Sequence, residues 1–464
     1  MFSAPSARVF RVNFFLDIWS VMGECCGMTK DPREILDKAP MSLIQIVIVG
    51  ITCALNGIDG FDVLSISFAS NGIANDWGIS PAVLGIVLSM ELVGMTIGSI
   101  VVGGIADALG RRYTTLTCLA IMAFGMLMTT TVENTTQMLI WRVLTGLGLG
   151  GLLATINALS AEFANRKRRH LCVSIMSIGY PIGGVVGGII ASRLLINHPW
   201  QSIFYFGAAI TALFIPIFFF VVPESVHWLI RKQPKDALKK VNSALRRMGH
   251  GAVDELPEVT LEARKKTMKD LFSPALVRMT TIVTVAYFFH IITYYFILKW
   301  VPRVVSDIMG YTASTAGNVL VCANVGGAVG GLIFGLLTLR FNPKKLTAGT
   351  IAIGALCIAF FGSIPYDNLL YVSLFAGLCG FFGNPGIVGM FALFAHVFPT
   401  HVRASGTGFC VGLGRGAGIL SPIIVGFLIQ SGFQLSVVTA LISIGGFIGA
   451  VILLFLKMPE NEVS

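Results

Sequence analysis

The sequence has few charged residues for a chain of its length. Lysine, arginine, aspartate and glutamate make up 12% of its 464 residues, whereas soluble globular domains carry roughly 25%. Hydrophobic residues make up 55%, and one chain in water has no core large enough to bury that much apolar surface. Because a bilayer solvates apolar side chains from outside, the composition predicts an integral membrane protein rather than a soluble domain.

Several chemical signatures are also missing. The sequence has no Gly-x-x-x-x-Gly-Lys-Ser/Thr loop to hold phosphates, so ATP-driven transport is not expected. Its nine cysteines show neither metal-ligand spacing nor the layout of a disulfide framework, and no paired set of catalytic side chains stands out. We therefore predict no enzyme activity, no metal and no cofactor. The net charge of +10 fits membrane orientation better than nucleic-acid binding.

Long apolar runs are what the sequence has in abundance. A spanning helix needs about 20 mainly apolar residues, and the alternating strands of a transmembrane barrel are not seen. Runs of the required kind fall at 42–70, 82–106, 114–132, 136–161, 170–192, 202–222, 276–301, 314–339, 346–364, 368–397, 404–430 and 435–457. They predict an all-α membrane protein with twelve transmembrane helices in two pseudo-symmetric six-helix bundles.

Polar segments divide the chain into five parts. We expect an N-terminal segment, a first bundle, a linker, a second bundle and a tail, at 1–40, 41–222, 223–275, 276–457 and 458–464. The linker has the pattern of short amphipathic helices rather than of a folded domain. The apolar stretch 9–21 is too short and too charged to span a membrane, and it lacks the layout of a signal peptide. We interpret Met28 as the native start and 1–27 as an upstream extension.

Lysines and arginines gather in alternate loops. The linker is rich in them, and basic pairs or runs also occupy loops of the same parity, at 111–112, 166–169 and 344–345. The loops of the other parity, for example 71–80 and 431–434, have none. Because basic loops stay inside the cell, we predict that both termini and the linker are cytoplasmic.

A loop rich in glycine and charge joins the second and third predicted spans. It contains Gly103, Asp107, Gly110, Arg111 and Arg112. The glycine allows two helices to approach closely, and the aspartate can pair with an arginine of the loop or with a neighbouring helix. The loop resembles the signature loop of the major facilitator superfamily, which implies that this cluster latches a cytoplasmic gate. The alternative is a set of charges that only sets the topology.

The first predicted span contains two carboxylates, Asp59 and Asp62. Each costs about 2.5–3.5 kcal/mol near the bilayer centre. Their spacing places both on one helical face, which should point at a cavity. This Asp-Gly-Phe-Asp element is similar to that of the aromatic acid:proton symporter family. The segments 31–42, 141–151 and 398–416 resemble the same family, so the resemblance covers nearly the whole chain from residue 31.

The resemblance implies import of aromatic or related carboxylates, such as hydroxybenzoates, together with protons across a bacterial inner (plasma) membrane. In that family both aspartates of the first helix matter for transport, and they correspond to Asp59 and Asp62. A carboxyl group in a semi-dry cavity readily holds a proton, so we predict that both couple proton movement, with Asp59 closer to the substrate. The alternative for either residue is a salt bridge to another helix.

Five further ionisable residues lie in predicted spans: Arg142, Arg415, Glu91, Lys299 and His290. We predict that Arg142 is the charge partner of an aspartate, with helix packing as the alternative. Arg415 suits a substrate carboxylate, which it can hold by two hydrogen bonds; otherwise it pairs with Glu91, which we place in the same substrate site. Lys299 either binds the anion or snorkels to the interface. His290 either joins the proton path or is only hydrogen-bonded.

These observations together predict a proton-coupled importer of small organic acids that works by alternating access. Its partners would be the organic anion, protons and the lipid bilayer, and a monomer is expected. Two alternatives keep the fold and change the cargo: a sugar porter, or an exporter of drugs or metabolites. A membrane sensor or channel is a different class, because a channel conducts without alternating access.

Overall fold

The computed structural model describes residues 31–456 apart from 258–270, 275, 339, 366 and 399–401, and it does not describe the side chains of residues 103, 104, 107, 170 and 403–405. The expected start at Met28 and the expected tail lie outside the described residues. The described residues include twelve helices of nineteen residues or more: α3 (Leu43–Trp77), α4 (Pro81–Leu109), α5 (Arg111–Thr129), α6 (Thr135–Glu162), α7 (Arg169–Asn197), α8 (Gln201–Val221), α11 (Val277–Asp307), α12 (Ala313–Leu337), α13 (Pro343–Phe361), α14 (Leu369–Val397), α15 (Arg403–Gln430) and α16 (Leu435–Leu454).

Eleven of these described helices are long and apolar enough to cross a membrane. The twelfth, α5, has 19 residues and begins with Arg111, Arg112 and Tyr113, which lower its apolar content. It nevertheless packs against α6 and α8 inside the first bundle. The chain is therefore the all-α membrane protein that its composition predicts.

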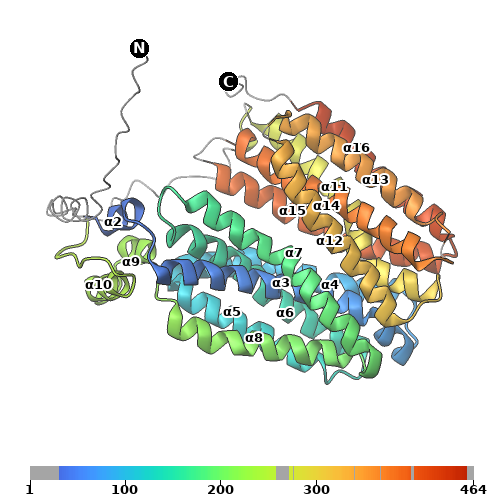
Figure 1. Ribbon diagram of the computed structural model, residues 1–464, viewed down its shortest axis with the longest axis horizontal. Helices are drawn as coiled ribbons and strands as arrows, with labels where there is room; N and C mark the ends of the chain where they lie inside the picture. Colours follow the sequence, from blue (N-terminus) through green and yellow to red (C-terminus); the bar gives the residue numbers. More distant parts are fainter. Residues whose placement is uncertain are drawn as a thin grey trace, which may run out of the picture.

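The long helices form two bundles that lie side by side (Figure 1), α3–α8 in the first and α11–α16 in the second. The linker between them contains α9 (Val226–Lys232) and α10 (Ala237–Arg247), the short helices expected there. Figure 1 shows both at one end of the first bundle, beside α2 (Pro32–Lys38), which contacts α9. We call this the linker end. The other end carries the turns that precede α4 and follow α15.

Local sequence accounts for where several helices begin and end. The side chain of Asn134 accepts a hydrogen bond from the backbone N–H of Gln137, 3.0 Å away, and so caps α6. Asn342 caps α13 in the same way and is followed by a proline at the first helical position. Helix α3 ends at Trp77 and is followed by Gly78, whose φ of 58° is left-handed and favours glycine.

Glycines allow one helix pair in each bundle to pack backbone against backbone. In the first bundle α4 and α6 are so close that a Cβ atom at Gly146 would overlap the carbonyl oxygen of Glu91. In the second bundle α12 and α14 have the same relation, because a Cβ atom at Gly380 would overlap the carbonyl oxygen of Ala323. Small residues at such crossings are typical of helix association in lipid. Both halves therefore contain a close helix crossing in which a glycine packs against a backbone carbonyl.

The described contacts between the two bundles gather toward the end opposite the linker. Helices α4 and α15 pack along each other, and the backbone N–H of Ala82 donates to Gln430 Oε1 at 3.2 Å. One turn or more further along, Ser89 Oγ donates to the carbonyl of Ile419 at 2.8 Å. Beside them, Asn71 Nδ2 of α3 donates to the carbonyl of Pro302 in α11 at 3.0 Å. These bonds close the interface at that end.

Candidate functional site

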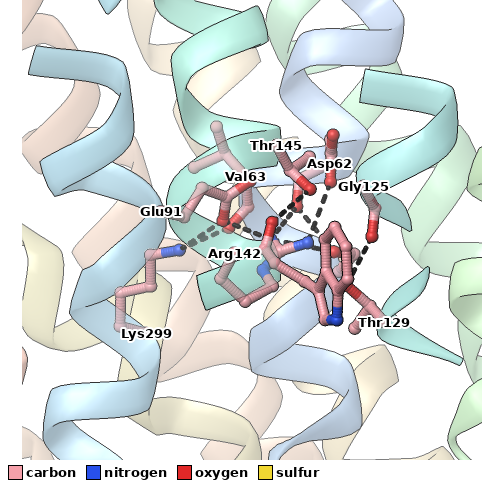
Figure 2. Close-up of polar contacts among 10 residues, drawn as sticks. Asp62, Val63, Glu91, Gly125, Thr129, Arg142, Thr145 and Lys299 are labelled. Atoms are coloured by element: carbon pink, nitrogen blue, oxygen red, sulfur yellow. Dashed lines mark hydrogen bonds and ion pairs between the residues drawn. The ribbon is translucent and has the colours of Figure 1, made fainter. Parts of the chain in front are cut away.

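Four buried ionisable side chains form one network in the interior of the protein (Figure 2). Arg142 of α6 lies between two carboxylates: its Nη1 is 3.3 Å from Asp62 Oδ1, and its Nη2 is 2.5 Å from Glu91 Oε2. Lys299 of α11 lies on the far side of Glu91, with Nζ 3.9 Å from Oε2. All four side chains are fully buried. We call Asp62, Glu91, Arg142 and Lys299 the charge network.

The charge network joins four helices and both halves of the protein. Its members come from α3, α4, α6 and α11. Lys299 also donates a hydrogen bond to the backbone carbonyl of Val63, which ties the second bundle to the first. Two carboxylates face two cations, so the network is balanced when all four groups are ionised, and the guanidinium of Arg142 also lies 5.3 Å from the ring centre of Phe204. Such pairing is what allows charges to remain in an apolar interior.

Asp59 lies outside this pairing although it is equally buried. Its exposed fraction is 0%, and neither carboxylate oxygen accepts a hydrogen bond from a described residue. The two aspartates of α3 therefore have different surroundings: Asp62 is held by Arg142, whereas Asp59 has no direct cationic partner in the described part of the chain. A buried carboxylate without a partner is costly when ionised.

Arg415 and two tyrosines lie in the electrostatic range of Asp59. Arg415 of α15 is half-buried, and its Nη1 donates to the carbonyl of Met95 on α4 at 3.1 Å. Tyr295 of α11 lies close enough to Arg415 and Asp59 to interact electrostatically with both. Tyr180 of α7 lies in the same range of Asp59 and Tyr295. Both tyrosines are half-buried, and Tyr295 packs against three separate apolar clusters. This part of the site thus combines one carboxyl group, one guanidinium and two aromatic rings.

The structure brings together some of the residues singled out from the sequence and separates others. The alternative pairing of Arg415 with Glu91 does not occur, because Glu91 pairs with Arg142 and Lys299. Snorkelling of Lys299 is also wrong, since its side chain is fully buried and bonded inside the protein. His290 contacts none of the carboxylates; its Nε2 lies 3.1 Å from the carbonyl oxygen of Gly383, and its ring stacks on Tyr294.

The charged loop between α4 and α5 lies at the linker end. Gly103 and Asp107 fall within α4, but their side chains are outside the described residues. Gly110 joins the two helices with a φ of 107°, a conformation that glycine tolerates best. Arg111 contacts Glu162 of α6, with Nε 3.7 Å from Oε1. Arg111 therefore forms an ion pair within the first bundle.

Glu224 closes the same cluster from the linker side. It follows α8, and its carboxylate accepts hydrogen bonds from the backbone N–H groups of Arg111 at 2.8 Å and Arg112 at 3.2 Å. Ser225 donates to Glu162. Burial raises the pKa of Glu224, and the backbone hydrogen bonds oppose that rise.

Sequence reasoning missed Glu162 and Tyr180 as site neighbours, because both lie on helices whose facing partners are distant in the chain.

A model of the Major Facilitator Superfamily matches the chain over residues 52–375 and 283–464. Two transport proteins with a related sequence span almost the same length. The gallate transporter of Pseudomonas putida is 28% identical over 91% of this chain and 94% of its own. The 4-hydroxybenzoate transporter of Acinetobacter baylyi is 29% identical over 92% of this chain and 94% of its own.

Solved structures share the fold at lower identity. The xylose transporter of E. coli, in a partially occluded inward-open conformation, superposes with a TM-score of 0.71 at 16% identity, over 91% of this chain and 100% of that one. A bacterial homolog of the human lysosomal transporter Spinster gives a TM-score of 0.65 at 15% identity, over 89% and 95% of the two chains. At these identities the likeness establishes the architecture alone.

Proposed function

The chain belongs to the Major Facilitator Superfamily, and we propose that it is a proton-coupled symporter that imports small organic acids, most closely suited to aromatic carboxylates. The cargo is suggested by relatives named for gallate, 4-hydroxybenzoate and benzoate, which match most of the chain. The membrane would be the bacterial cell membrane, and the working unit a monomer. The linker end would face the cytoplasm, because the basic loops lie there.

The observation that carries the proposal is the contrast between Asp59 and the charge network. The network is internally balanced, with two carboxylates against two cations. Asp59 is left over, fully buried and without a hydrogen-bond donor among the described residues. In so dry a position the neutral, protonated carboxyl is the favoured form. Asp59 is therefore proposed to carry the coupled proton, with Asp62 and Arg142 as the charge pair that responds when it is released.

Arg415 is the cation left over on the other side of the site. Its side chain is half-buried, and its one bond to a described residue goes to the backbone carbonyl of Met95 rather than to a carboxylate. A substrate carboxylate could take the remaining guanidinium donors as a bidentate pair. Tyr180 and Tyr295 would then lie beside the aromatic ring of the substrate, where stacking suits a planar ring.

Alternating access would work by rocking the two bundles about this central site. The described contacts between the bundles gather at the end opposite the linker, so this conformation would be open toward the cytoplasm. Release of the proton from Asp59 would weaken the hold on the anion at Arg415. The loop with Gly103, Asp107, Gly110, Arg111 and Arg112 is proposed to close the linker end in the opposite conformation. His290 would stabilise the α11–α14 contact through Gly383 rather than carry protons.

Uptake of a panel of radiolabelled acids into cells that express the protein tests the proposal. The panel contains gallate, 4-hydroxybenzoate, benzoate, an aliphatic monocarboxylate and xylose, each measured with and without a protonophore. We expect saturable accumulation of an aromatic acid that disappears on uncoupling. Accumulation of xylose alone would replace the proposal by a sugar porter. Accumulation of an acid that survives the protonophore would remove the proton from the mechanism and leave the substrate class intact.

A further inference from the structure

A basic cavity lies at the linker end, away from the charge network and outside the proposed transport site. Its volume is about 230 Å³, and it is enclosed by the start of α5, the segment after α8, and helices α9 and α10. Three of the side chains that line it are cations: Arg112, Lys240 and Arg247. We call it the linker cavity. In Figure 1, α9 and α10 lie at the linker end of the first bundle, and Arg247 of α10 bonds to the end of α8.

The cations of the linker cavity have no acidic partner in the part of the chain that the structure describes. Among the described residues no carboxylate forms an ion pair with any of the three. Glu224 is the one described carboxylate in the lining, and it already accepts hydrogen bonds from the backbone N–H groups of Arg111, Arg112 and Ser225. The cavity therefore concentrates positive charge.

The two arginines are held in place by backbone carbonyls. Arg112 Nη2 donates to the carbonyl of Phe219 at 2.6 Å, and Arg247 Nη2 donates to the carbonyl of Phe220 at 2.6 Å. Each guanidinium thus uses one donor on the C-terminal end of α8 and keeps others for a ligand. The Nε atom of Arg112 is buried and has no hydrogen-bond partner in the described part of the chain. Such preorganised donors suit phosphate oxygens.

The exposed side chains around the linker cavity favour a position near the edge of the bilayer. Tyr113 lines it and is 61% exposed, and Phe220 beside it is 69% exposed. Exposed aromatic side chains at a helix end are typical of the boundary between lipid headgroups and acyl chains. Basic pockets in this position bind the headgroups of anionic lipids.

We propose that the linker cavity binds a phosphate-bearing anion, and that its source is the headgroup of an anionic membrane phospholipid. Arg112, Lys240 and Arg247 contact the phosphate, and Tyr113 and Phe220 lie along the start of the acyl chains. A bound headgroup links α10 of the linker to α5 and α8 of the first bundle. The proposal concerns a site separate from the transported acid, and it stands whichever substrate the protein carries.

Binding of lipids to the purified, delipidated full-length protein tests this site. Native mass spectrometry would compare phosphatidylglycerol with phosphatidylcholine, and a parallel titration would use inorganic phosphate alone. The test variant is Lys240→Gln/Arg247→Gln. The matched control is Lys239→Gln/Arg246→Gln, which removes the same charge from α10 at residues that do not line the cavity. Lys240→Gln against Lys239→Gln repeats the comparison without disturbing the arginine bond to α8.

We expect the wild type to prefer phosphatidylglycerol, and the Lys240/Arg247 variant to lose that preference roughly thirtyfold, because each of the two basic residues near an anionic headgroup contributes about 1 kcal/mol and each 1.4 kcal/mol is a factor of ten. The control pair should keep it. If inorganic phosphate alone binds with the same dependence on Lys240 and displaces the lipid, the phosphate site stands and its source is soluble. Equal losses in the test and control pairs, or equal binding of both lipids without phosphate binding, would overturn the proposal.

Discussion

Helices α4 and α6 in the first bundle and helices α12 and α14 in the second are packed alike, but they carry different side chains. Gly146 lies against the carbonyl of Glu91, and Gly380 lies against the carbonyl of Ala323. If these two contacts are equivalent, Glu91 corresponds to Ala323. The residues four positions before the two glycines are Arg142 and Ala376. The ion pair of the first bundle is therefore replaced by two fully buried alanines in the second.

This difference separates packing from function. The second bundle shows that such a helix pair packs through glycine and alanine alone, without an ion pair at the crossing. Charges inside a membrane are costly, so their presence in the first bundle calls for another reason. The carboxylates of the site, Asp59, Asp62 and Glu91, all lie in the first bundle, and the second contributes Lys299 and Arg415. We propose that the first half holds the coupled proton, and that Lys299 and Arg415 of the second half supply cations to the network and to the substrate anion.

The largest expected effect comes from removing the carboxylate of Asp59, which has no partner in the described part of the chain. In Asp59→Asn, accumulation of an aromatic acid against its gradient should fall to background, because an amide cannot release a proton. Exchange of labelled for unlabelled acid should persist, since the neutral side chain imitates the protonated form. Vesicle uptake and exchange assays measure both.

The control for this experiment is Asp76→Asn, which removes a carboxylate from the same helix. Asp76 lies at the end opposite the linker, where it accepts a hydrogen bond from Trp200 Nε1 at 2.7 Å. Its replacement should leave coupled uptake intact. Uphill accumulation that survives in Asp59→Asn would show that the proton is carried elsewhere.

The next largest effect should come from breaking the charge network. Arg142→Ala leaves Asp62 and Glu91 facing Lys299 alone, and loss of one partner of a buried ion pair costs about 3–5 kcal/mol. The double variant Glu91→Ala/Arg142→Ala copies the second bundle and keeps the charges balanced, so it should be more stable than Arg142→Ala. Thermal unfolding of the detergent-solubilised proteins measures this. A double variant less stable than the single one would contradict the proposed equivalence.

Smaller losses are expected from the glycines that the two bundles share. Gly146→Ala and Gly380→Ala should each reduce stability by about 1–3 kcal/mol, because the added methyl group overpacks a helix crossing. Similar losses in both would support the repeat. Gly50→Ala and Gly349→Ala are the controls, one in each bundle, since nothing lies within 4 Å of a Cβ atom at either position. Melting temperatures that fall equally in all four variants would instead point to a general effect of replacing glycine.

Replacing Arg415 is expected to lower the affinity for the transported acid without loss of proton coupling. Arg415→Gln should raise KM for the transported acid about tenfold, or about 1.4 kcal/mol, because a charge-assisted hydrogen bond is lost. Arg415→Lys should lie between the two, since it keeps the charge without the bidentate geometry. Initial rates of uptake measure KM, and an unchanged KM with a reduced maximal rate would assign Arg415 to the conformational change instead.

The smallest effect should be the pH dependence that Glu224 adds outside the membrane. Burial raises its pKa above the ordinary value of 4.5, so the folded state holds the proton more tightly than the unfolded state does. Folding stability is then lost as the pH rises from 4.5 through the raised pKa. Glu224→Gln should flatten this part of the stability profile. Melting temperatures at a series of pH values would reveal it, and parallel profiles for the two proteins would exclude this role.

Much of the fold could be predicted from the sequence because each span is a local property. Runs of about 20 apolar residues predict the helices. In the described structure, eleven of the twelve long helices are long and apolar enough to cross a membrane. Capping residues such as Asn134 and Asn342 indicate where helices begin. Helix α5 is the weakest case, since its arginines belong both to the helix and to the loop that precedes it.

The site was less predictable because ion pairs form between helices distant in the chain. The spacing of Asp59 and Asp62 places them on one face of α3, but it does not reveal that only Asp62 meets Arg142. The sequence offers Arg415 as an alternative partner of Glu91, whereas the structure pairs Glu91 with Lys299. The sequence also leaves open whether the side chain of Lys299 is buried. Each of these depends on the rotation and height of one helix relative to its neighbours.

The sequence by itself determined an all-α membrane protein with a carboxylate pair inside its first span, because hydropathy and the helical repeat act within about twenty residues. Only the tertiary structure decided which charges are paired. Arg142 meets Asp62 across 80 residues of chain, and Lys299 reaches the carbonyl of Val63 across 236. The packing of helices through their glycines sets these distances, and it thereby leaves Asp59 buried without a partner among the described residues.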